Sequence, residues 1–231
     1  MSIFSKRDDR IKHKLKLVSI HIPKTAGTSF RNTLKEVYQP QNVIRLDINL
    51  LDEVIHIDER LWSKKKLASE VEVAHGHFSP FIFEKLFRSS PTPFITWLRH
   101  PVERVISNFY YLEKRLQEEL DEKSKGLNIL SKMQRTLMEY AADPLNQNRM
   151  TKFLHGKPLD DFAFVGIQEH YLEDLQHLGK QLGWQKIPHF QHNTTGKARS
   201  VSPLQREEIA RFNREDMALY QAALALREKR L

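Results

Sequence analysis

The chain has 231 residues, of which 40% are hydrophobic and 29% charged, and this length and composition suit one globular domain with its own core. It has no cysteine, which excludes a disulfide scaffold, a thiolate metal site and a cysteine nucleophile. The formal net charge of +8 favours an anionic partner, such as a nucleic acid, a phosphorylated cofactor, a polyanion or a membrane surface.

The N-terminal segment carries positive charge but lacks the apolar stretch of a secretory signal. No run of about 18 apolar residues predicts a membrane span. We therefore expect a flexible basic tail over residues 1–14, a single domain over residues 15–231 and a cytoplasmic location.

Apolar, β-branched segments alternate with amphipathic ones along the chain. The first kind predicts strands at residues 15–22, 42–48, 71–77, 93–100 and 162–167. The second kind predicts helices at residues 28–38, 101–116, 127–143, 146–156, 169–183 and 202–231. Pro101 suits the first position of its helix, and Ser202 begins a capping-box pattern. Residues 49–70 are expected to be irregular or helical.

Strands that alternate with helices pair in parallel through right-handed crossovers. The predicted fold is therefore α/β, a single P-loop-like domain with a central parallel sheet flanked by helices and a helical C-terminal end. Ligands of such sheets bind beyond the carboxyl ends of the strands. The site is expected at four strand-to-helix junctions, which are residues 22–29, 75–80, 98–103 and 166–170.

The first junction lies in "SIHIPKTAGTSF", residues 19–30. A loop that leads from a strand into a helix presents free backbone N–H groups to an anion, and a glycine there lets the backbone approach closely. The candidate phosphate-binding residues are Lys24, Thr25, Ala26, Gly27, Thr28 and Ser29. The simpler alternative is a turn capped by Thr28 or Ser29, which explains one hydroxyl but neither the others nor the lysine. The loop lacks the G-K-[ST] ending of a Walker A motif.

A second anion site is predicted at "LRHPVERVISNFYY", residues 98–111. Arg99 ends a strand, and Ser107 lies on the same face of the following helix as Arg104. A forked guanidinium beside a hydroxyl suits a phosphate group. The alternative is an ion pair between Arg99 and an acid such as Glu103.

Together these stretches resemble the two nucleotide motifs of sulfotransferases that use 3′-phosphoadenosine 5′-phosphosulfate (PAPS). The branch most similar is that of the carbohydrate sulfotransferases, which includes the heparan sulfate and uronyl 2-O-sulfotransferases. The likeness runs from about residue 17 to residue 221 and includes "NRMTKFLHG", "FVGIQEHYLEDLQHLGKQLG", "HNTTGKARSVS" and "REDMALY". His100 departs from the family pattern, which usually has Asp there. The family's Golgi location is not implied, because no membrane anchor is seen.

The resemblance implies that PAPS is the donor, without a metal, and that the acceptor is a hydroxyl of a carbohydrate such as an anionic glycan. Residues 24–29 would hold the 5′-phosphosulfate, with Lys24 stabilising the leaving phosphate. Arg99 and Ser107 would hold the 3′-phosphate. No nucleic-acid partner is expected, and the sequence leaves the oligomeric state open.

An H-G-H motif at His75 and His77 ends the third predicted strand. By themselves two such histidines are more often polar residues of a turn, and no third ligand stands at a metal-site spacing. The family resemblance implies instead that His77 is the general base and that His75 assists it or contacts the acceptor.

Other basic and hydroxyl residues have weaker signals. The resemblance implies that a loop over residues 192–200 covers the nucleotide, through Thr194, Thr195, Lys197 and Arg199, although an ordinary exposed basic loop would have the same composition. Arg149 and Lys152 are candidates for contacting an anionic acceptor, and the alternative is that they simply face solvent.

Two rival functions remain open at this point. One is a Mg²⁺-dependent nucleotide kinase, which the missing G-K-[ST] disfavours. The other is a non-catalytic protein that binds nucleotides or polyanions.

Overall fold

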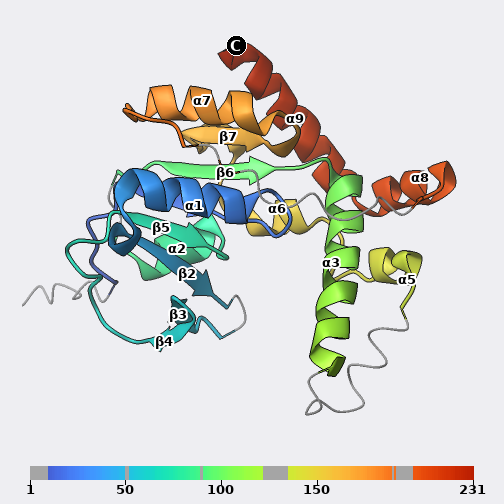
Figure 1. Ribbon diagram of the computed structural model, residues 1–231, viewed down its shortest axis with the longest axis horizontal. Coiled ribbons are helices and arrows are strands. Elements are labelled where there is room, and N and C mark those ends of the chain that lie inside the picture. The colour runs from blue at the N-terminus through green and yellow to red at the C-terminus, as the bar shows by residue number, and fades with distance from the viewer. Residues whose placement is uncertain (1–9, 50–51, 89–90, 122–134, 189, 191–199) are drawn as a thin grey trace, which may run out of the picture.

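A seven-stranded sheet forms the centre of the computed structural model, which describes residues 10–49, 52–88, 91–121, 135–188, 190 and 200–231 (Figure 1). The strand order is β4-β3-β2-β5-β1-β6-β7. The strands are β1 (Leu17–Ile20), β2 (Val43–Ile48), β3 (Ile55–Ile57), β4 (Arg60–Trp62), β5 (Val73–Gly76), β6 (Phe94–Leu98) and β7 (Phe164–Ile167).

Five of the strands are parallel, as predicted: β1 pairs with β5 and β6, β5 with β2, and β6 with β7. The prediction for residues 49–70 was wrong, because that segment adds the antiparallel hairpin β3–β4 to the sheet edge. Its turn places Asp58 and Glu59 at positive φ, 48° and 69°. Such turns are usually marked by Asn-Gly or Asp-Gly, so this Asp-Glu pair gave no hairpin signal.

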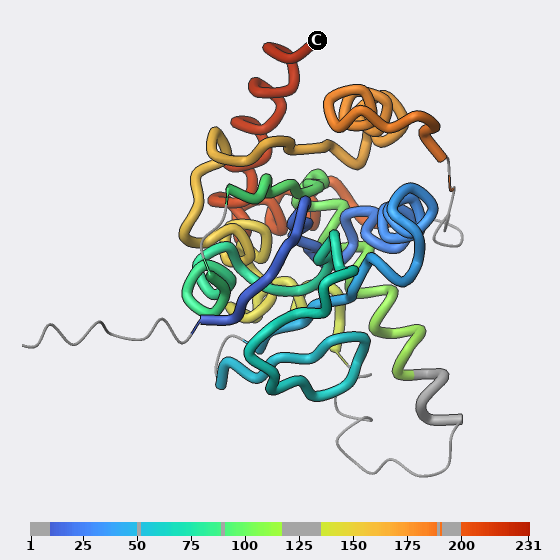
Figure 2. The backbone as a smooth tube through the Cα atoms, turned by 90° about the vertical axis from the view of Figure 1, so that its left-hand side faces the viewer, coloured from blue at the N-terminus to red at the C-terminus, as the bar shows by residue number. Residues whose placement is uncertain are grey.

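Helices cover both faces of the sheet. One face packs on α1 and α7 through residues such as Phe30, Leu34, Leu175 and Leu178. The other face packs on α2, α6 and α9, and Figure 2 shows α1 and α7 on the opposite side of the sheet from α2. The helices are α1 (Gly27–Tyr38), α2 (Pro80–Leu86), α3 (Pro101–Asp121), α5 (Leu137–Ala142), α6 (Arg149–Phe153), α7 (Tyr171–Gln181), α8 (Pro203–Phe212) and α9 (Arg214–Arg230), with 3₁₀ turns η1 (Pro40–Asn42), η2 (Leu159–Asp161) and η3 (Gln168–His170).

A third apolar cluster joins α3, α5 and α8 at the end of the molecule where the parallel strands finish (Figure 1). The capping box predicted at Ser202 is present at the start of α8. The predicted C-terminal helix is divided in two at Asn213. The buried side chain of Asn213 donates to the Ile209 carbonyl and accepts from the backbone N–H of Asn148.

Two more helices differ from their predicted bounds. The helix predicted over residues 127–143 begins, within the described residues, after Thr136, which forms a capping box with Glu139. The helix predicted over residues 146–156 is reduced to Arg149–Phe153, because Asn148 adopts a left-handed conformation with φ of 49°.

The segment predicted as a basic tail is partly packed against the domain. Residues 1–9 lie outside the described part of the chain. Ile11 is buried and forms a β-bridge with Phe87, while Lys12 forms one with Lys66. An isolated isoleucine among charged residues gave no periodic signal, and only the groove left between two other segments buries it.

The carboxyl ends of four parallel strands lie side by side, in the order β5, β1, β6, β7. The residues that follow these ends are His77, His21, Arg99 and Gln168. The predicted junctions therefore lie next to one another, and Figure 1 shows the arrow of β6 ending beside α3.

Candidate active site

The loop between β1 and α1 is held in an unusual backbone conformation. Lys24 and Ala26 have φ of 72° and 69°, in the left-handed region. For a residue with a Cβ this conformation costs roughly 1–2 kcal/mol, and it recurs at functional sites. The buried Thr25 hydroxyl donates to the Ile22 carbonyl at 2.9 Å and closes the turn.

Helix α1 begins at Gly27, and Ala26 precedes it without a side-chain cap. The alternative that Thr28 or Ser29 caps the helix is therefore wrong, because both lie inside its first turn. The first backbone N–H groups of α1 are therefore not used by a side-chain cap. They lie at the positive end of the helix dipole, where an anion would be stabilised. The Thr28 side chain is exposed and Ser29 is buried.

Gly27 is required by a neighbouring ring. A Cβ at this position would lie 1.8 Å from Nε2 of His21, closer than any two such atoms can approach. The His21 imidazole therefore occupies the space directly beside the start of α1. It links the loop between β1 and α1 to His75, in β5, and to His77, which follows that strand.

Lys24 and Arg99 meet at this loop, as the sequence predicted for the two motifs. The Arg99 guanidinium donates through Nη1 to the Lys24 carbonyl at 3.3 Å. Burial, and secondarily the charge of Arg99, lowers the pKa of Lys24. Burial also lowers the pKa of Arg99, against the opposite effects of Glu169 and Glu103.

Neither cation has an ion-pair partner among the described residues. The Lys24 ammonium lies 4.0 Å over the ring of Tyr111 instead. The Arg99 Nε is buried without a hydrogen bond. Two adjacent, half-buried cations without a paired carboxylate carry charge that an anion would complement.

The hydroxyl of Ser107 is in the same condition. Ser107 lies in the second turn of α3, is buried, and its Oγ has no hydrogen-bond partner within the described structure. Arg104, one turn earlier, is also buried and donates to the Asn146 carbonyl at 3.3 Å. Buried polar atoms of native proteins are almost always satisfied, so the unpartnered Ser107 hydroxyl is a group that a ligand could satisfy.

Three histidines stack beyond the ends of β1 and β5. The ring of His21 lies 5.1 Å from that of His75 and 4.5 Å from that of His77, measured between centroids. Nδ1 of the buried His75 is 2.9 Å from the Ser19 hydroxyl. Burial, then the neighbouring charge of His77, lowers the pKa of His75 to about 3, so it is neutral at physiological pH. Burial likewise lowers the pKa of His21 well below its ordinary value.

His77 differs from the other two because a carboxylate orients it. Asp47 of β2 accepts from Nδ1 of His77 at 2.8 Å and from its backbone N–H at 3.1 Å. Arg45 forms an ion pair with the same carboxylate at 2.7 Å. Burial by itself raises the pKa of Asp47, but the hydrogen bonds from His77 and the charges of His77 and Arg45 outweigh burial and lower it. An ionised Asp47 holds the proton on Nδ1 and leaves Nε2 able to accept one.

Asp47 was missed in the sequence analysis. It stands between two buried residues, Leu46 and Ile48, in a strand that also carries Arg45. The two charged residues at alternate positions of this strand were the available signal. Its meaning depended on knowing that β2 lies beside β5, since the pairing of parallel strands cannot be read from the chain order.

Arg149 is linked to the histidines only through Phe153, and its guanidinium donates to the Leu145 carbonyl at 3.3 Å. The Arg149 guanidinium lies 5.2 Å over the Phe153 ring, which in turn is 6.3 Å from the His77 ring. The exposed Lys152 ammonium donates instead to the Pro144 carbonyl at 2.6 Å. The start of α6 is fixed by the buried Asp216, which accepts from the backbone N–H groups of Met150 and Thr151.

Glu169 lies in the 3₁₀ turn η3, which follows β7. Its carboxylate accepts from the His100 backbone N–H at 2.9 Å and from the Tyr220 hydroxyl at 3.1 Å. It thus fixes the turn that carries Arg99. The remaining candidates, Thr194, Thr195, Lys197 and Arg199, lie outside the described residues.

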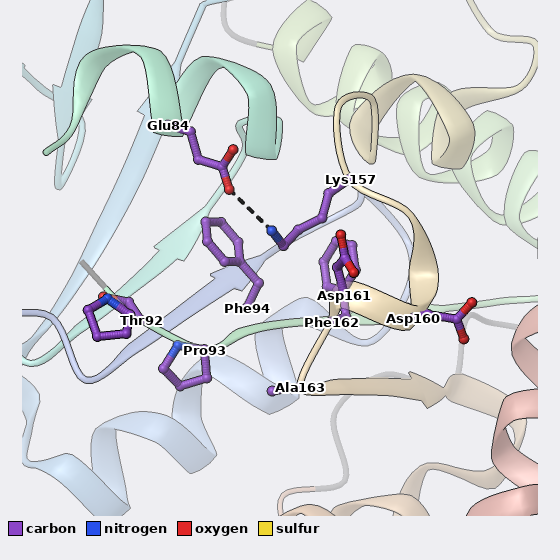
Figure 3. Close-up of a pocket in the computed structure, with 10 residues that line it drawn as sticks. Glu84, Thr92, Pro93, Phe94, Lys157, Asp160, Asp161, Phe162 and Ala163 are labelled. Carbon is purple, nitrogen blue, oxygen red and sulfur yellow. Dashed lines mark hydrogen bonds and ion pairs between the residues drawn. The ribbon is translucent and has the colours of Figure 1, made fainter. Parts of the chain in front are cut away.

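Within the described part of the chain, no three metal-ligating side chains come together, and no helix is long and apolar enough to cross a bilayer. A cavity of about 420 Å³ opens at the amino ends of the parallel strands, where β6 and β7 begin. Figure 3 shows that Lys157 and Glu84 in this cavity face each other, and they form an ion pair at 3.2 Å. The cavity has no part in the strand-end cluster.

Comparison with known proteins identifies the family. A family model described as "Sulfotransferase family" matches residues 7–221. The chain belongs to the sulfotransferase family, and the resemblance seen in the two nucleotide motifs is confirmed.

Two curated relatives share part of the chain. The heparan sulfate 2-O-sulfotransferase 1 of Pongo abelii and that of Homo sapiens are each 30% identical to it over 97 residues. The match covers 39% of this chain and only 27% of the length of either relative.

Among solved structures, a sulfotransferase from Alicyclobacillus acidocaldarius aligns with a TM-score of 0.46 at 15% identity, covering 90% of this chain and 95% of that one. The mouse sulfotransferase SULT7A1 complexed with PAP aligns with a TM-score of 0.42 at 13% identity, covering 89% of this chain and 64% of that one.

Proposed function

We propose that the protein transfers a sulfuryl group from PAPS to a hydroxyl of a carbohydrate acceptor, with His77 as the general base. The observation that carries this proposal is the placement of a carboxylate-oriented histidine beside an anion-binding loop. His21 contacts both parts, so the base and the loop have a fixed separation.

The residues present suit a donor with two anionic groups. The loop of residues 24–29 and the start of α1 offer backbone donors and one ammonium. Arg99 and the unpartnered Ser107 hydroxyl offer a second set of donors next to it. PAPS supplies a sulfuryl group activated by its 5′-phosphate, and its 3′-phosphate would occupy the second set.

The protein's part in the chemistry follows from these side chains. Nε2 of His77 accepts the proton of the acceptor hydroxyl, while Asp47 holds the ring in the required tautomer and stabilises the imidazolium that forms. Lys24 and the N–H groups of the loop stabilise the negative charge that develops on the leaving phosphate. In-line transfer of this kind is accelerated mainly by positioning and charge.

His75 has a supporting role in this scheme. It is fully buried and neutral, and its Nδ1 is engaged by Ser19. Its ring fixes that of His21, which packs on His77. We therefore assign the base to His77 and treat His75 as a residue that positions it.

The acceptor class rests on two features. The curated relatives are named for heparan sulfate, an anionic glycan. Arg149 is held close to His77 by Phe153, where it would meet a carboxylate or sulfate of such an acceptor. Lys152 stands one turn further on and would contribute at longer range.

The decisive experiment is calorimetric titration with 3′,5′-adenosine bisphosphate (PAP) in the absence of Mg²⁺, beside ATP and 5′-AMP. We expect metal-free binding that requires the 3′-phosphate and is weakened by Arg99→Ala. His77→Ala should bind PAP as the wild type does yet transfer no sulfuryl group to a uronate-containing oligosaccharide. Binding of ATP with Mg²⁺ alone would sink the proposal and favour a kinase.

A further inference from the structure

A basic groove lies near the amino ends of the parallel strands, whereas the candidate active site lies at their carboxyl ends. The groove is a cavity of about 350 Å³ lined by Lys12, His13, Lys14, Lys66, Leu67, Ser69 and Arg88. These residues come from the segment before β1, the segment before β5 and the end of α2. Because they precede the parallel strands that Lys24 and His77 follow, they lie roughly 25 Å from the loop, at about 3.3 Å per extended residue over residues 15–22.

The groove is built by backbone hydrogen bonds between distant segments. The Lys12 N–H donates to the Lys65 carbonyl at 3.1 Å, and the Leu67 N–H donates to the Lys12 carbonyl at 2.9 Å. The Arg88 N–H donates to the Ile11 carbonyl at 2.8 Å. Three cationic segments are therefore held together by the fold, with Leu67 buried beneath them.

His13 forms a neutral wall of the groove. Its Nε2 lies 3.0 Å from the Arg88 carbonyl, and its Nδ1 accepts from the Leu15 N–H at 3.3 Å. Both ring nitrogens are thus engaged as they are in an uncharged imidazole. The ligand-facing charge is carried by Lys12, Lys14, Lys66 and Arg88.

These four cations are exposed, and none forms an ion pair with a described carboxylate. Of the acids nearby in the sequence, Glu70 accepts at 3.3 Å from the hydroxyl of Ser69, a residue that lines the groove, and Glu72 pairs with Lys16 at 2.5 Å. By contrast, Lys157 in the cavity of Figure 3 is paired with the Glu84 carboxylate. Gathering four like charges costs Coulomb energy, which an anionic ligand would offset.

We infer that the basic groove binds the sulfate or carboxylate groups of an anionic polysaccharide, at a segment of the acceptor remote from the sugar that reacts. Among the described residues the only aromatic ring that lines the groove is that of His13, which packs edge-on against Phe83 and Phe87, whereas a site for single-stranded nucleic acid would stack bases on several open aromatic rings. Ammonium groups on flexible stems suit irregularly spaced anionic groups. The acceptor's identity rests on the proposed function, but binding in the groove requires neither donor nor turnover.

The test removes charge in two places. The variant Lys12→Ala/Lys66→Ala/Arg88→Ala changes exposed groove residues. The matched control, Lys180→Ala/Lys186→Ala/Lys229→Ala, removes the same charge from exposed positions on and near α7 and α9. Affinity for a fluorescein-labelled, size-fractionated heparin oligosaccharide is measured by anisotropy at several salt concentrations, and PAP affinity by calorimetry.

We expect the groove variant to bind heparin about tenfold more weakly, with a shallower salt dependence, and the control to bind within about twofold of the wild type. PAP affinity should be unchanged in both. An equal loss in both variants would show that only net charge matters, and no loss in either would show that heparin does not bind in the groove. Each of these outcomes would overturn the inference. Equally tight, groove-dependent binding of a single-stranded DNA of matched charge would overturn the choice of polysaccharide.

The outcome is separable from that of the proposed function. If the wild type failed to bind PAP while the groove variant lost heparin affinity, the proposed reaction would be wrong and the groove would stand. If PAP bound and the groove variant kept full heparin affinity, the groove would be wrong and the proposed reaction would stand.

Discussion

Replacing Asp47 by asparagine tests the pairing on which the proposed mechanism depends. The amide keeps the size of the side chain but removes its charge, and it offers an N–H₂ group as well as an oxygen to Nδ1 of His77. The ring is then no longer held in the tautomer that leaves Nε2 free, and the imidazolium loses its counter-charge.

The expected loss is in turnover rather than in folding. A positioned general base contributes roughly 10²–10⁴-fold, so we expect kcat to fall by at least about 10². The ion pair with Arg45 is partly exposed on both sides, at 30% and 23% of the side-chain surface, and is worth at most about 1 kcal/mol of stability. Arg99 and Ser107, which are proposed to bind the 3′-phosphate, follow β6 and lie on α3 respectively. The affinity for PAP should therefore be unchanged.

The assay measures transfer of labelled sulfuryl from PAPS to a uronate-containing oligosaccharide, with PAP affinity as the control for an intact site. A double-mutant cycle sharpens the result. In the His77→Ala background, Asp47→Asn should cost nothing more, because the residue acts only through the ring. Full activity of Asp47→Asn, or losses that simply multiply in the double variant, would refute the reasoning.

Three further predictions concern the loop, the second anion site and the buried histidine. Gly27→Ala places a Cβ 1.8 Å from the His21 ring and should cost about 1–3 kcal/mol, lowering the thermal midpoint, whereas the double variant with His21→Ala should recover much of that stability. Ser107→Ala should leave the urea midpoint unchanged, since its hydroxyl has no partner in the protein, yet weaken PAP binding about five- to tenfold; a stability loss without an affinity loss would contradict this role. Because the pKa of His75 is lowered to about 3, its contribution to stability is complete above its ordinary value of 6.5 and is lost as the pH falls towards 3. Between pH 7 and pH 5, the free energy of unfolding measured in urea should therefore fall by about 2 kcal/mol less in His75→Gln than in the wild type. Equal falls in the two proteins would contradict this prediction.

Local signals in the sequence were sufficient for most of the fold. The apolar strands that became β1, β5 and β6 were bounded by proline or glycine, and their helices began with strong start signals such as Pro101 and Ser202. The hairpin β3–β4 escaped because its turn lacks glycine, and the C-terminal helix was divided by long-range hydrogen bonds to Asn213.

The candidate site was predictable where motifs are contiguous. Lys24, Gly27, Arg99 and the H-G-H pair each stand at or just after a strand end, and parallel topology requires strand ends to converge, whereas Ser107 lies in the helix that follows Arg99. The partners of these residues were not predictable, because they come from other strands.

The sequence by itself determined the class of fold, the two motifs proposed to bind anions and the family, since these depend on residue types at fixed spacing along one segment. Only the tertiary structure decided that Asp47 orients His77, that His21 joins the base to the loop, and that four cations from three segments form one groove. Each of these depends on which strands are neighbours, and neighbours in a sheet are chosen by the burial of whole faces rather than by the residues that later do the chemistry.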